Sequence, residues 1–205
     1  MTRMAGFYIA TEDRLSEALV EKIVVATGHS VAAKIPRDRR RHQGFGYLKK
    51  RLHEFLRASS GGGIPFFILT DLDQSTCPSS LIDTWLMGAT VPTGFLFRVA
   101  VHEVESWVLA DRERFGNWLG INSGSIPSTP DTVPLPKEKL LQLVSGARNR
   151  DIRDGLLPKK GASSPVGLEY NDRLCEFVRD QWRINIAASS SPSLASAIRR
   201  LREVQ

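Results

Sequence analysis

The chain has 205 residues and a mass of 22.8 kDa, which suits one domain of generous size or one domain with an appendage. Its 41% hydrophobic and 24% charged residues exclude a wholly disordered protein, and no apolar run approaches the ~18 residues that a membrane helix needs. Lys and Arg (28) exceed Asp and Glu (22), and the net charge of +6 favours a polyanionic partner, although solubility alone can explain it.

The beginning of the chain and its two cysteines are typical of a protein of the reducing cytoplasm. Charged residues arrive by Glu12 with no long apolar run before them, so we expect no signal peptide. Cys77 and Cys175 lie far apart and neither belongs to a CxxC pair, which argues against a disulfide framework and against a cysteine zinc site. We therefore expect a soluble, cytoplasmic protein with no membrane partner.

Short apolar runs alternate with segments of helical periodicity through the first half of the chain. The pattern predicts strands at 7–10, 30–35, 64–70 and 94–101, and helices at 14–27, 47–59, 81–87 and 103–118. The run at 64–70 is apolar on both faces of the strand, as expected for a buried strand of a parallel sheet. This alternation predicts an α/β fold with a mostly parallel, Rossmann-like sheet flanked by helices.

The composition changes at about residue 120. Residues 120–136 are rich in Ser, Pro, Thr and Gly, and helical patterns follow at 137–153, 169–183 and 193–204 without another convincing strand. We therefore predict an α/β domain at 1–119, a connection at 120–136, and a helical extension at 137–205 that packs on the core.

Acidic residues follow three of the predicted strands. They are Glu12 and Asp13, then Asp71 and Asp73, then Glu103 and Glu105. The carboxyl ends of parallel strands form the edge at which open α/β sheets bind ligands, and carboxylates gathered there repel one another. A divalent cation would relieve this repulsion, and hard oxygen ligands select Mg²⁺ or Mn²⁺ over zinc. Glu12 or Asp13 could instead cap the following helix, and Glu103 and Glu105 could be partners of a helix dipole. Aspartates such as Asp71 and Asp73 are also common in loops, so the metal hypothesis depends on the coincidence of all three pairs.

A basic segment occupies residues 34–57. It holds nine Lys and Arg against two acids, a local charge of +7 that exceeds the charge of the whole chain. The nucleic-acid-binding candidates in it are Arg37, Arg39, Arg40, Arg41, Lys49, Lys50 and Arg51, with Phe45 and Tyr47 available to stack a base. A weaker cluster follows at Arg148, Arg150, Arg153, Lys159 and Lys160. A solvated helix face or a docking patch for an acidic protein are the alternatives.

These motifs resemble a known family. A strand followed by Glu, two further strand–helix steps and a strand followed by Asp-x-Asp resemble the TOPRIM (topoisomerase–primase) fold. The motif HEVESWVLAD at 102–111 is similar to TOPRIM-like proteins encoded beside ATPases of the OLD (overcoming lysogenisation defect) kind in bacterial defence loci. The resemblance covers roughly residues 5–115 by motif.

The resemblance implies which residues form the site. The family's first Glu falls on Glu12, its Asp-x-Asp pair on Asp71 and Asp73, and its later acid on Glu105, with Glu103 as the competing choice. The family often has a glycine-rich turn around the first Glu. This chain has ATEDR there, so Asp13 stays open as an alternative to Glu12.

The resemblance also implies a Mg²⁺-dependent (or Mn²⁺-dependent) nuclease of an anti-phage system, with an ATPase partner. In this scheme Asp71 and Asp73 hold the principal ion, while Glu105 shares it or binds a second one. Glu12 ligates through water or serves as general base, and His102 and Lys137 are candidate phosphate contacts. DNA, RNA or tRNA as substrate and a homodimeric state are left open.

Two other functions fit parts of the sequence. Phosphatases of the haloacid-dehalogenase type also place Asp-x-Asp after a strand, with the first Asp as nucleophile, although usually after the first strand of the domain. A catalytically silent subunit that binds nucleic acid or an ATPase would need the basic segment and no metal. A nucleotide-sugar transferase that uses Asp-x-Asp with Mn²⁺ fits less well, because the chain is short.

Overall fold

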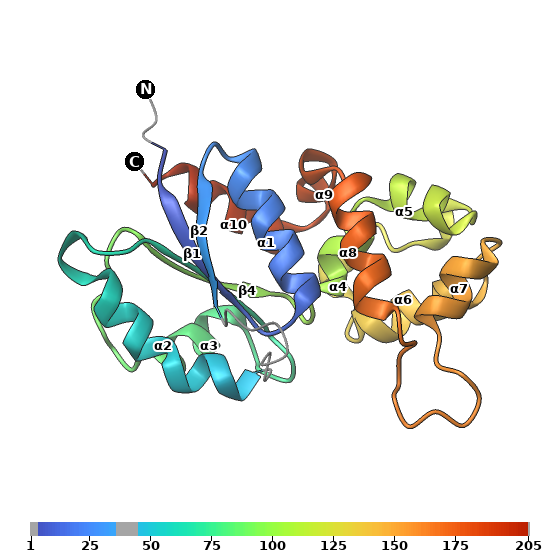
Figure 1. The fold of residues 1–205 in the computed structure, drawn as a ribbon, viewed down its shortest axis with the longest axis horizontal. Coiled ribbons are helices and arrows are strands. Elements are labelled where there is room, and N and C mark those ends of the chain that lie inside the picture. The colour runs from blue at the N-terminus through green and yellow to red at the C-terminus, as the bar shows by residue number, and fades with distance from the viewer. Residues whose placement is uncertain (1–3, 36–44, 205) are drawn as a thin grey trace.

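Four parallel strands form the centre of the computed structural model, which describes residues 4–35 and 45–204 (Figure 1). Their order in the sheet is β2–β1–β3–β4, and their bounds are β1 (Gly6–Thr11), β2 (Ser30–Ile35), β3 (Phe66–Asp71) and β4 (Phe95–Ala100). The predicted α/β fold with a parallel sheet and flanking helices is confirmed, and each predicted strand is present within a few residues of its expected bounds.

Helices connect the strands and form the second half of the chain. The first half holds α1 (Arg14–Ala26), α2 (Phe45–Ser59), the 3₁₀ turn η2 (Ser60–Gly62), α3 (Pro78–Leu86), α4 (Glu105–Ala110) and α5 (Arg112–Leu119). The second half holds the 3₁₀ turns η3 (Ser123–Ser125) and η4 (Pro130–Thr132), then α6 (Pro136–Ser145), α7 (Arg150–Leu156), α8 (Tyr170–Asp180), α9 (Ile184–Ser190) and α10 (Pro192–Arg202).

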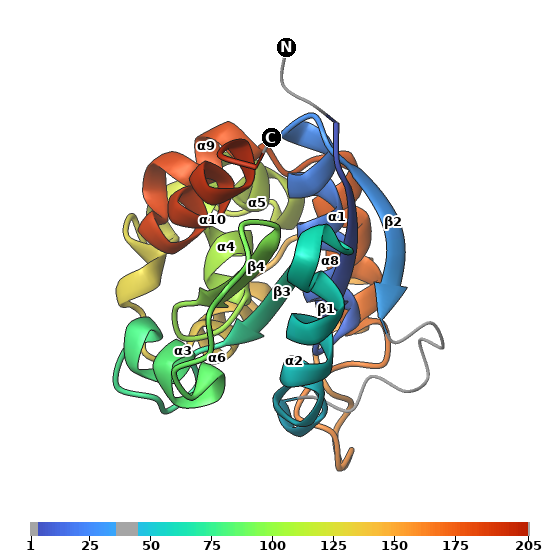
Figure 2. The ribbon, with the colours of Figure 1, turned by 90° about the vertical axis from the view of Figure 1, so that its left-hand side faces the viewer.

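Strand β3 is buried on both faces, as its continuous apolar run predicts. Phe67 and Leu69 belong to one hydrophobic cluster, whereas Phe66 and Ile68 belong to another on the opposite face of the sheet. The smaller cluster is covered by α2 and α3, which lie nearest the viewer in Figure 2. The larger cluster contains α1 together with residues of the helical second half, so the helical extension shares its core with the sheet.

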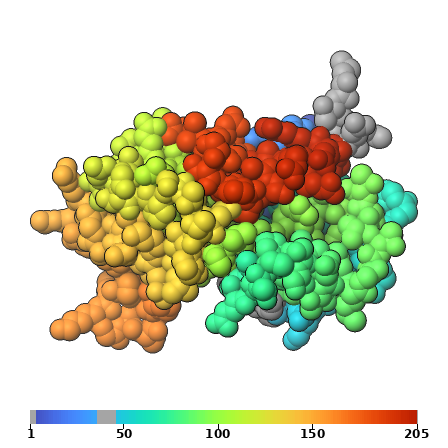
Figure 3. All heavy atoms as spheres, turned by 180° about the vertical axis from the view of Figure 1, so that it is seen from behind, coloured from blue at the N-terminus to red at the C-terminus, as the bar shows by residue number. Residues whose placement is uncertain are grey.

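Two buried tryptophans join α4 to the end of the chain. The indole of Trp107 donates to the Ser193 hydroxyl (2.8 Å), and the indole of Trp182 donates to the Trp107 carbonyl (2.9 Å). Because α9 packs on α4 and α10 packs on β4, α9 and α10 cross the back of the molecule from the helical half to the sheet (Figure 3). The last helices thereby hold α4 in place at the end of β4.

The structure differs from the predicted helices at two breaks. The single helix expected at 103–118 is two helices, because Asp111 leaves helical geometry (ψ 68°) and its side chain caps α5. The single helix expected at 137–153 also divides, since Gly146 ends α6 and Asn149 caps α7. Helix α9 was not predicted. Within the described residues, no helix combines the length and the apolar composition that crossing a bilayer would require.

Candidate functional site

The sheet order brings two predicted acidic segments together. The chain leaves β1 toward β2 on one side and returns to β3 on the other, so β1 and β3 are neighbours at a topological switch point. Open α/β sheets bind ligands outside the carboxyl ends of their strands at such a point. We call the acidic residues at or beyond the carboxyl ends of β1, β3 and β4 the acidic edge. They are Glu12, Asp13, Asp71, Asp73, Glu103 and Glu105.

Glu12 follows β1 and reaches across to the end of β3. Its Oε1 accepts hydrogen bonds from the Thr70 hydroxyl and from the Asp71 backbone N–H (3.3 Å). Burial raises the pKa of Glu12 to about 7 and outweighs the two hydrogen bonds, which lower it; the charges of Asp73 and Asp13 add smaller upward contributions. A half-buried carboxyl group with this pKa can exchange a proton near neutral pH.

Asp71 and Asp73 take different places at the end of β3. The Asp71 Oδ1 accepts the backbone N–H of Val104 (2.8 Å), which fixes the turn before α4. Burial raises the pKa of Asp71 well above its ordinary value, and the charge of Glu105 adds to this. Asp73 is exposed and adopts a left-handed backbone (φ 48°), a conformation that Asp tolerates better than most residues. Its pKa is also raised, by desolvation and then by Glu103.

Glu105 is the first residue of α4 and is only 1% exposed. Its Oε1 accepts the Tyr170 hydroxyl (2.8 Å) and lies 3.4 Å from the Lys137 Nζ. Its Oε2 is buried and has no hydrogen-bond partner within the described part of the chain. Burial raises the pKa of Glu105 to about 7, even though the ammonium of Lys137 and the hydroxyl of Tyr170 both lower it.

Glu103 and Asp13 each act on a helix N-terminus. The Glu103 Oε2 accepts the Lys137 backbone N–H (2.8 Å) at the start of α6, and its Oε1 lies 3.8 Å from the Lys137 Nζ. Asp13 is the N-cap of α1 and accepts the Ser16 backbone N–H (2.7 Å). Both residues therefore have a structural task, whereas Glu12 and Glu105 have buried carboxyl groups that no helix end requires.

Lys137 and Tyr170 come from the helical extension. Burial opposes the charge of Lys137, but Glu105, Glu103 and Asp71 outweigh it and raise the pKa of the ammonium to about 12. The sequence analysis named Lys137 only as a phosphate contact and did not identify Tyr170. No local pattern could have found Tyr170, because it lies 65 residues from Glu105 and meets it only through the packing of α8.

The residue types of the acidic edge suit a divalent cation, but their present arrangement does not form a coordination site. All its donors are oxygen atoms, and the Glu105 Oε2 is a buried acceptor without a donor. Among the described residues, however, no three His, Cys, Asp or Glu side chains are arranged to hold one metal ion. The cation beside Glu105 is the Lys137 ammonium. Coordination would require new rotamers of the carboxylates and withdrawal of Lys137.

The basic segment is described in part. Arg37, Arg39, Arg40 and Arg41 lie outside the described residues, while Lys49 and Lys50 are exposed on α2. Arg51 donates to Glu54 Oε2 (2.8 Å) and to the Tyr47 hydroxyl (2.9 Å) and lies over the Phe55 ring, so its guanidinium packs along its own helix.

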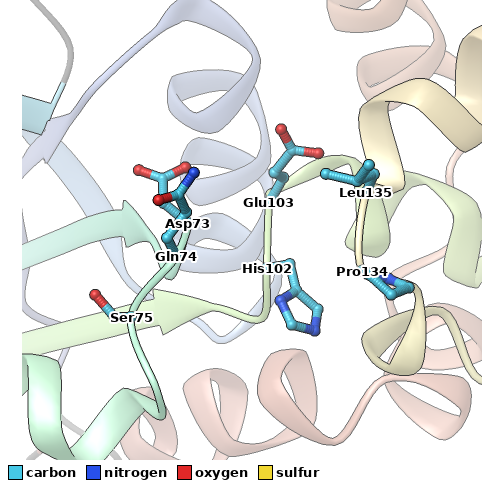
Figure 4. A pocket seen from close by; sticks show the side chains of 7 residues that line it. All are labelled: Asp73, Gln74, Ser75, His102, Glu103, Pro134 and Leu135. Carbon is cyan, nitrogen blue, oxygen red and sulfur yellow. The ribbon is translucent and has the colours of Figure 1, made fainter.

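A hollow of about 650 Å³ opens beside the acidic edge (Figure 4). Three separate segments line it: residues 73–75 after β3, residues 102–103 after β4, and residues 134–135 before α6. The connection before α6 therefore contributes to the hollow, while Lys137 and Tyr170 of the helical extension contact the acidic edge next to it.

Comparison of the chain with protein-family models, with curated proteins and with solved structures found no match. The four-stranded parallel sheet is therefore established by the structure, and the TOPRIM resemblance stays a prediction that rests on the motifs.

Proposed function

We propose that the protein hydrolyses phosphodiester bonds of nucleic acid at the acidic edge with the help of Mg²⁺ or Mn²⁺. The observation that carries the proposal is the gathering of Glu12, Asp71 and Glu105. They come from three separate segments to one sheet edge, and burial, with smaller contributions from neighbouring carboxylates, raises the pKa of each. The TOPRIM resemblance points to the same chemistry.

Uncompensated negative charge at this edge is the physical argument for a cation. Desolvating a carboxylate is costly unless the group is paired, and perturbed carboxyl pKa values concentrate at functional sites. Here one ammonium, Lys137, faces Glu103 and Glu105 together. A bound Mg²⁺ would balance the remaining charge, and it would supply an activated water and neutralise charge on the phosphate during hydrolysis.

The residues of the chain would divide the work. Asp71 and Asp73, at the open end of β3, would hold the principal ion, and Glu105 would share it through its unpartnered Oε2. Glu12, with a pKa of about 7, would accept a proton from the attacking water. Lys137, released from Glu105 by the ion, would contact the phosphate.

The proposed substrate rests on the exposed lysines of α2, and the proposed partner rests on the family resemblance. Lys49 and Lys50 are exposed on α2 and would attract a phosphate backbone. The ATPase partner, the anti-phage role and the location in the cytoplasm are proposals from the resemblance and from the composition, and a homodimer stays open.

Cleavage of labelled DNA and RNA, single-stranded and duplex, tests the proposal. We expect cleavage with Mg²⁺ and none with EDTA, and at least ~10²-fold less in the double variant Asp71→Asn plus Asp73→Asn. The matched control, Asp83→Asn plus Asp154→Asn, changes two exposed aspartates outside the acidic edge and should retain activity.

The other outcomes identify the rival functions. Nucleic-acid binding without cleavage would favour the silent subunit, and hydrolysis of a simple phosphomonoester without cleavage would favour the phosphatase. Full cleavage by the double variant would show that the active site lies elsewhere.

A further inference from the structure

The hollow beside the acidic edge has the size of a small-molecule site. Its volume of about 650 Å³ lies within the roughly 300–1,000 Å³ that ligand pockets span. In Figure 4 residues 73–75 lie on one side, Pro134 and Leu135 lie on the other, and His102 and Glu103 lie between them. Because Asp73, a proposed metal ligand, belongs to its lining, whatever enters the hollow is adjacent to the proposed metal site.

The lining offers neutral polar groups and an apolar wall. The side chains of Gln74, Ser75 and His102 form no hydrogen bond to any other described residue, so their donors and acceptors are available. Opposite them Pro134 is exposed and Leu135 is 54% exposed, although leucine is usually removed from water. The hollow thus combines uncommitted hydrogen-bonding groups with an uncovered apolar surface.

The charged residues that line the hollow disfavour an anion inside it. Asp73 and Glu103 are the charged residues of the lining, and both are acidic, so a phosphate group would be repelled. An uncharged ring with polar atoms along its edge and apolar faces would not be repelled, and it could use both the hydrogen-bonding groups and the apolar wall of the hollow. A nucleobase has these properties: its faces stack on apolar and aromatic side chains, and its edge bonds to amide and hydroxyl groups.

We propose that the hollow receives one unpaired nucleobase of the strand that is cut at the acidic edge. This inference rests on the proposed function and adds its substrate class, a single-stranded nucleic acid. Pro134 and Leu135 contact one face of the base, while the Gln74 amide contacts its edge. A base inside a duplex would first have to leave its stack, which costs free energy, so single strands are cut faster than duplexes.

Two measurements on the full chain test the inference. The first is NMR saturation transfer with the four uncharged nucleosides and metal-free protein. We expect at least one nucleoside to bind, and Gln74→Ala and Leu135→Ala each to weaken binding about tenfold. Gln181→Ala and Leu168→Ala are matched controls, since both residues are exposed outside the hollow. All four positions are solvent-exposed, so the variants should fold.

The second measurement maps the ends that wild-type protein and Mg²⁺ produce from a random-sequence single strand. We expect a base preference at one position beside the cut, and Gln74→Ala should flatten it while Gln181→Ala retains it. Cleavage with no base preference, or nucleoside binding that survives both hollow variants, overturns the inference and leaves the proposed function intact. Hollow-dependent nucleoside binding without any cleavage supports the base site and overturns the proposed function.

Discussion

Two carboxylates at opposite ends of one short helix are buried in very different surroundings. Asp111, just past α4, is 0% exposed and accepts the Arg183 backbone N–H (2.8 Å), its Nε (3.0 Å) and its Nη2 (2.7 Å). Glu105, at the start of α4, is 1% exposed, and one of its oxygens has no partner within the described part of the chain. Both carry a charge that burial penalises, but only Asp111 has a full set of donors.

The contrast separates a structural carboxylate from a functional one. Asp111 fastens the beginning of α9 to α5 and so secures the helices that hold α4. Glu105 has a pKa of about 7, and its two partners, the Tyr170 hydroxyl and the Lys137 ammonium, do not offset the cost of burying its charge. The unfavourable burial of the Glu105 carboxylate therefore lies at the edge where we propose that a cation binds. Substitutions of Asp111, of Glu105 and of their partners should therefore have different effects on stability.

The largest expected effect is on the structural side. Asp111→Ala removes the acceptor of three Arg183 hydrogen bonds and the cap of α5, so the free energy of unfolding should fall by roughly 2–3 kcal/mol. Glu113→Ala, which removes only the exposed second partner of Arg183, should change it by less than about 0.5 kcal/mol. Urea denaturation of both variants measures the difference. Equal, small losses would remove the distinction between the two carboxylates.

Substitution of Glu105 should raise the free energy of unfolding, whereas substitution of Asp111 should lower it. The folded-state pKa of Glu105, about 7, lies above its ordinary value, so the folded protein holds this proton more tightly than the unfolded chain. Its contribution to stability is therefore full below pH ~4.5 and is lost as the pH rises through about 7. Glu105→Gln cannot lose a proton, and at pH 8 without metal it should be more stable than wild type by roughly 1–2 kcal/mol.

Denaturation at two pH values tests this sign. The stability difference between Glu105→Gln and wild type should shrink at pH 5 and disappear below pH ~4.5, where the carboxyl group is protonated in both the folded and the unfolded wild-type chain. The variant should also cleave nucleic acid poorly at pH 8. A variant that is clearly less stable than wild type at pH 8 would place Glu105 with Asp111 as a structural group.

The smallest effect concerns the hydroxyl that holds Glu105. Tyr170→Phe removes the hydrogen bond to Oε1 at a cost of about 1 kcal/mol. Because this bond lowers the pKa of Glu105, its loss should raise the pH at which the metal-free pH–stability curve levels off, which is about 7 in wild type. Tyr8→Phe is the control, since the Tyr8 hydroxyl has no hydrogen bond to the described residues. If the curve levels off at the same pH in Tyr170→Phe as in wild type, Tyr170 does not position the carboxylate.

Much of the fold was predictable because apolar periodicity depends on local sequence. The run at β3 and the helical patterns of α1 and α2 are each decided by side chains within one element. The parallel order then brings the ends of β1 and β3 together, which is why Glu12 and Asp71 could be anticipated as neighbours.

The rest depended on contacts between distant segments. Asp111 looked like part of an acidic motif, but its partner is Arg183, 72 residues away, and this pairing makes it structural. The contact of Tyr170 with Glu105 likewise arises from the packing of α8, and the hollow is completed by residues 134–135 from a connection without regular pattern. Sequence spacing carries no signal for such pairs.

Titration of Mn²⁺, followed by the electron paramagnetic resonance signal of the free ion, tests the central claim most directly. We predict that wild-type protein removes free Mn²⁺ from solution at pH 8, and that Glu105→Gln and Asp71→Asn each bind it at least ~10-fold more weakly, while Asp83→Asn binds as wild type does. If wild-type protein leaves millimolar Mn²⁺ free, or if both edge variants bind it as tightly as wild type, the acidic edge is not a metal site.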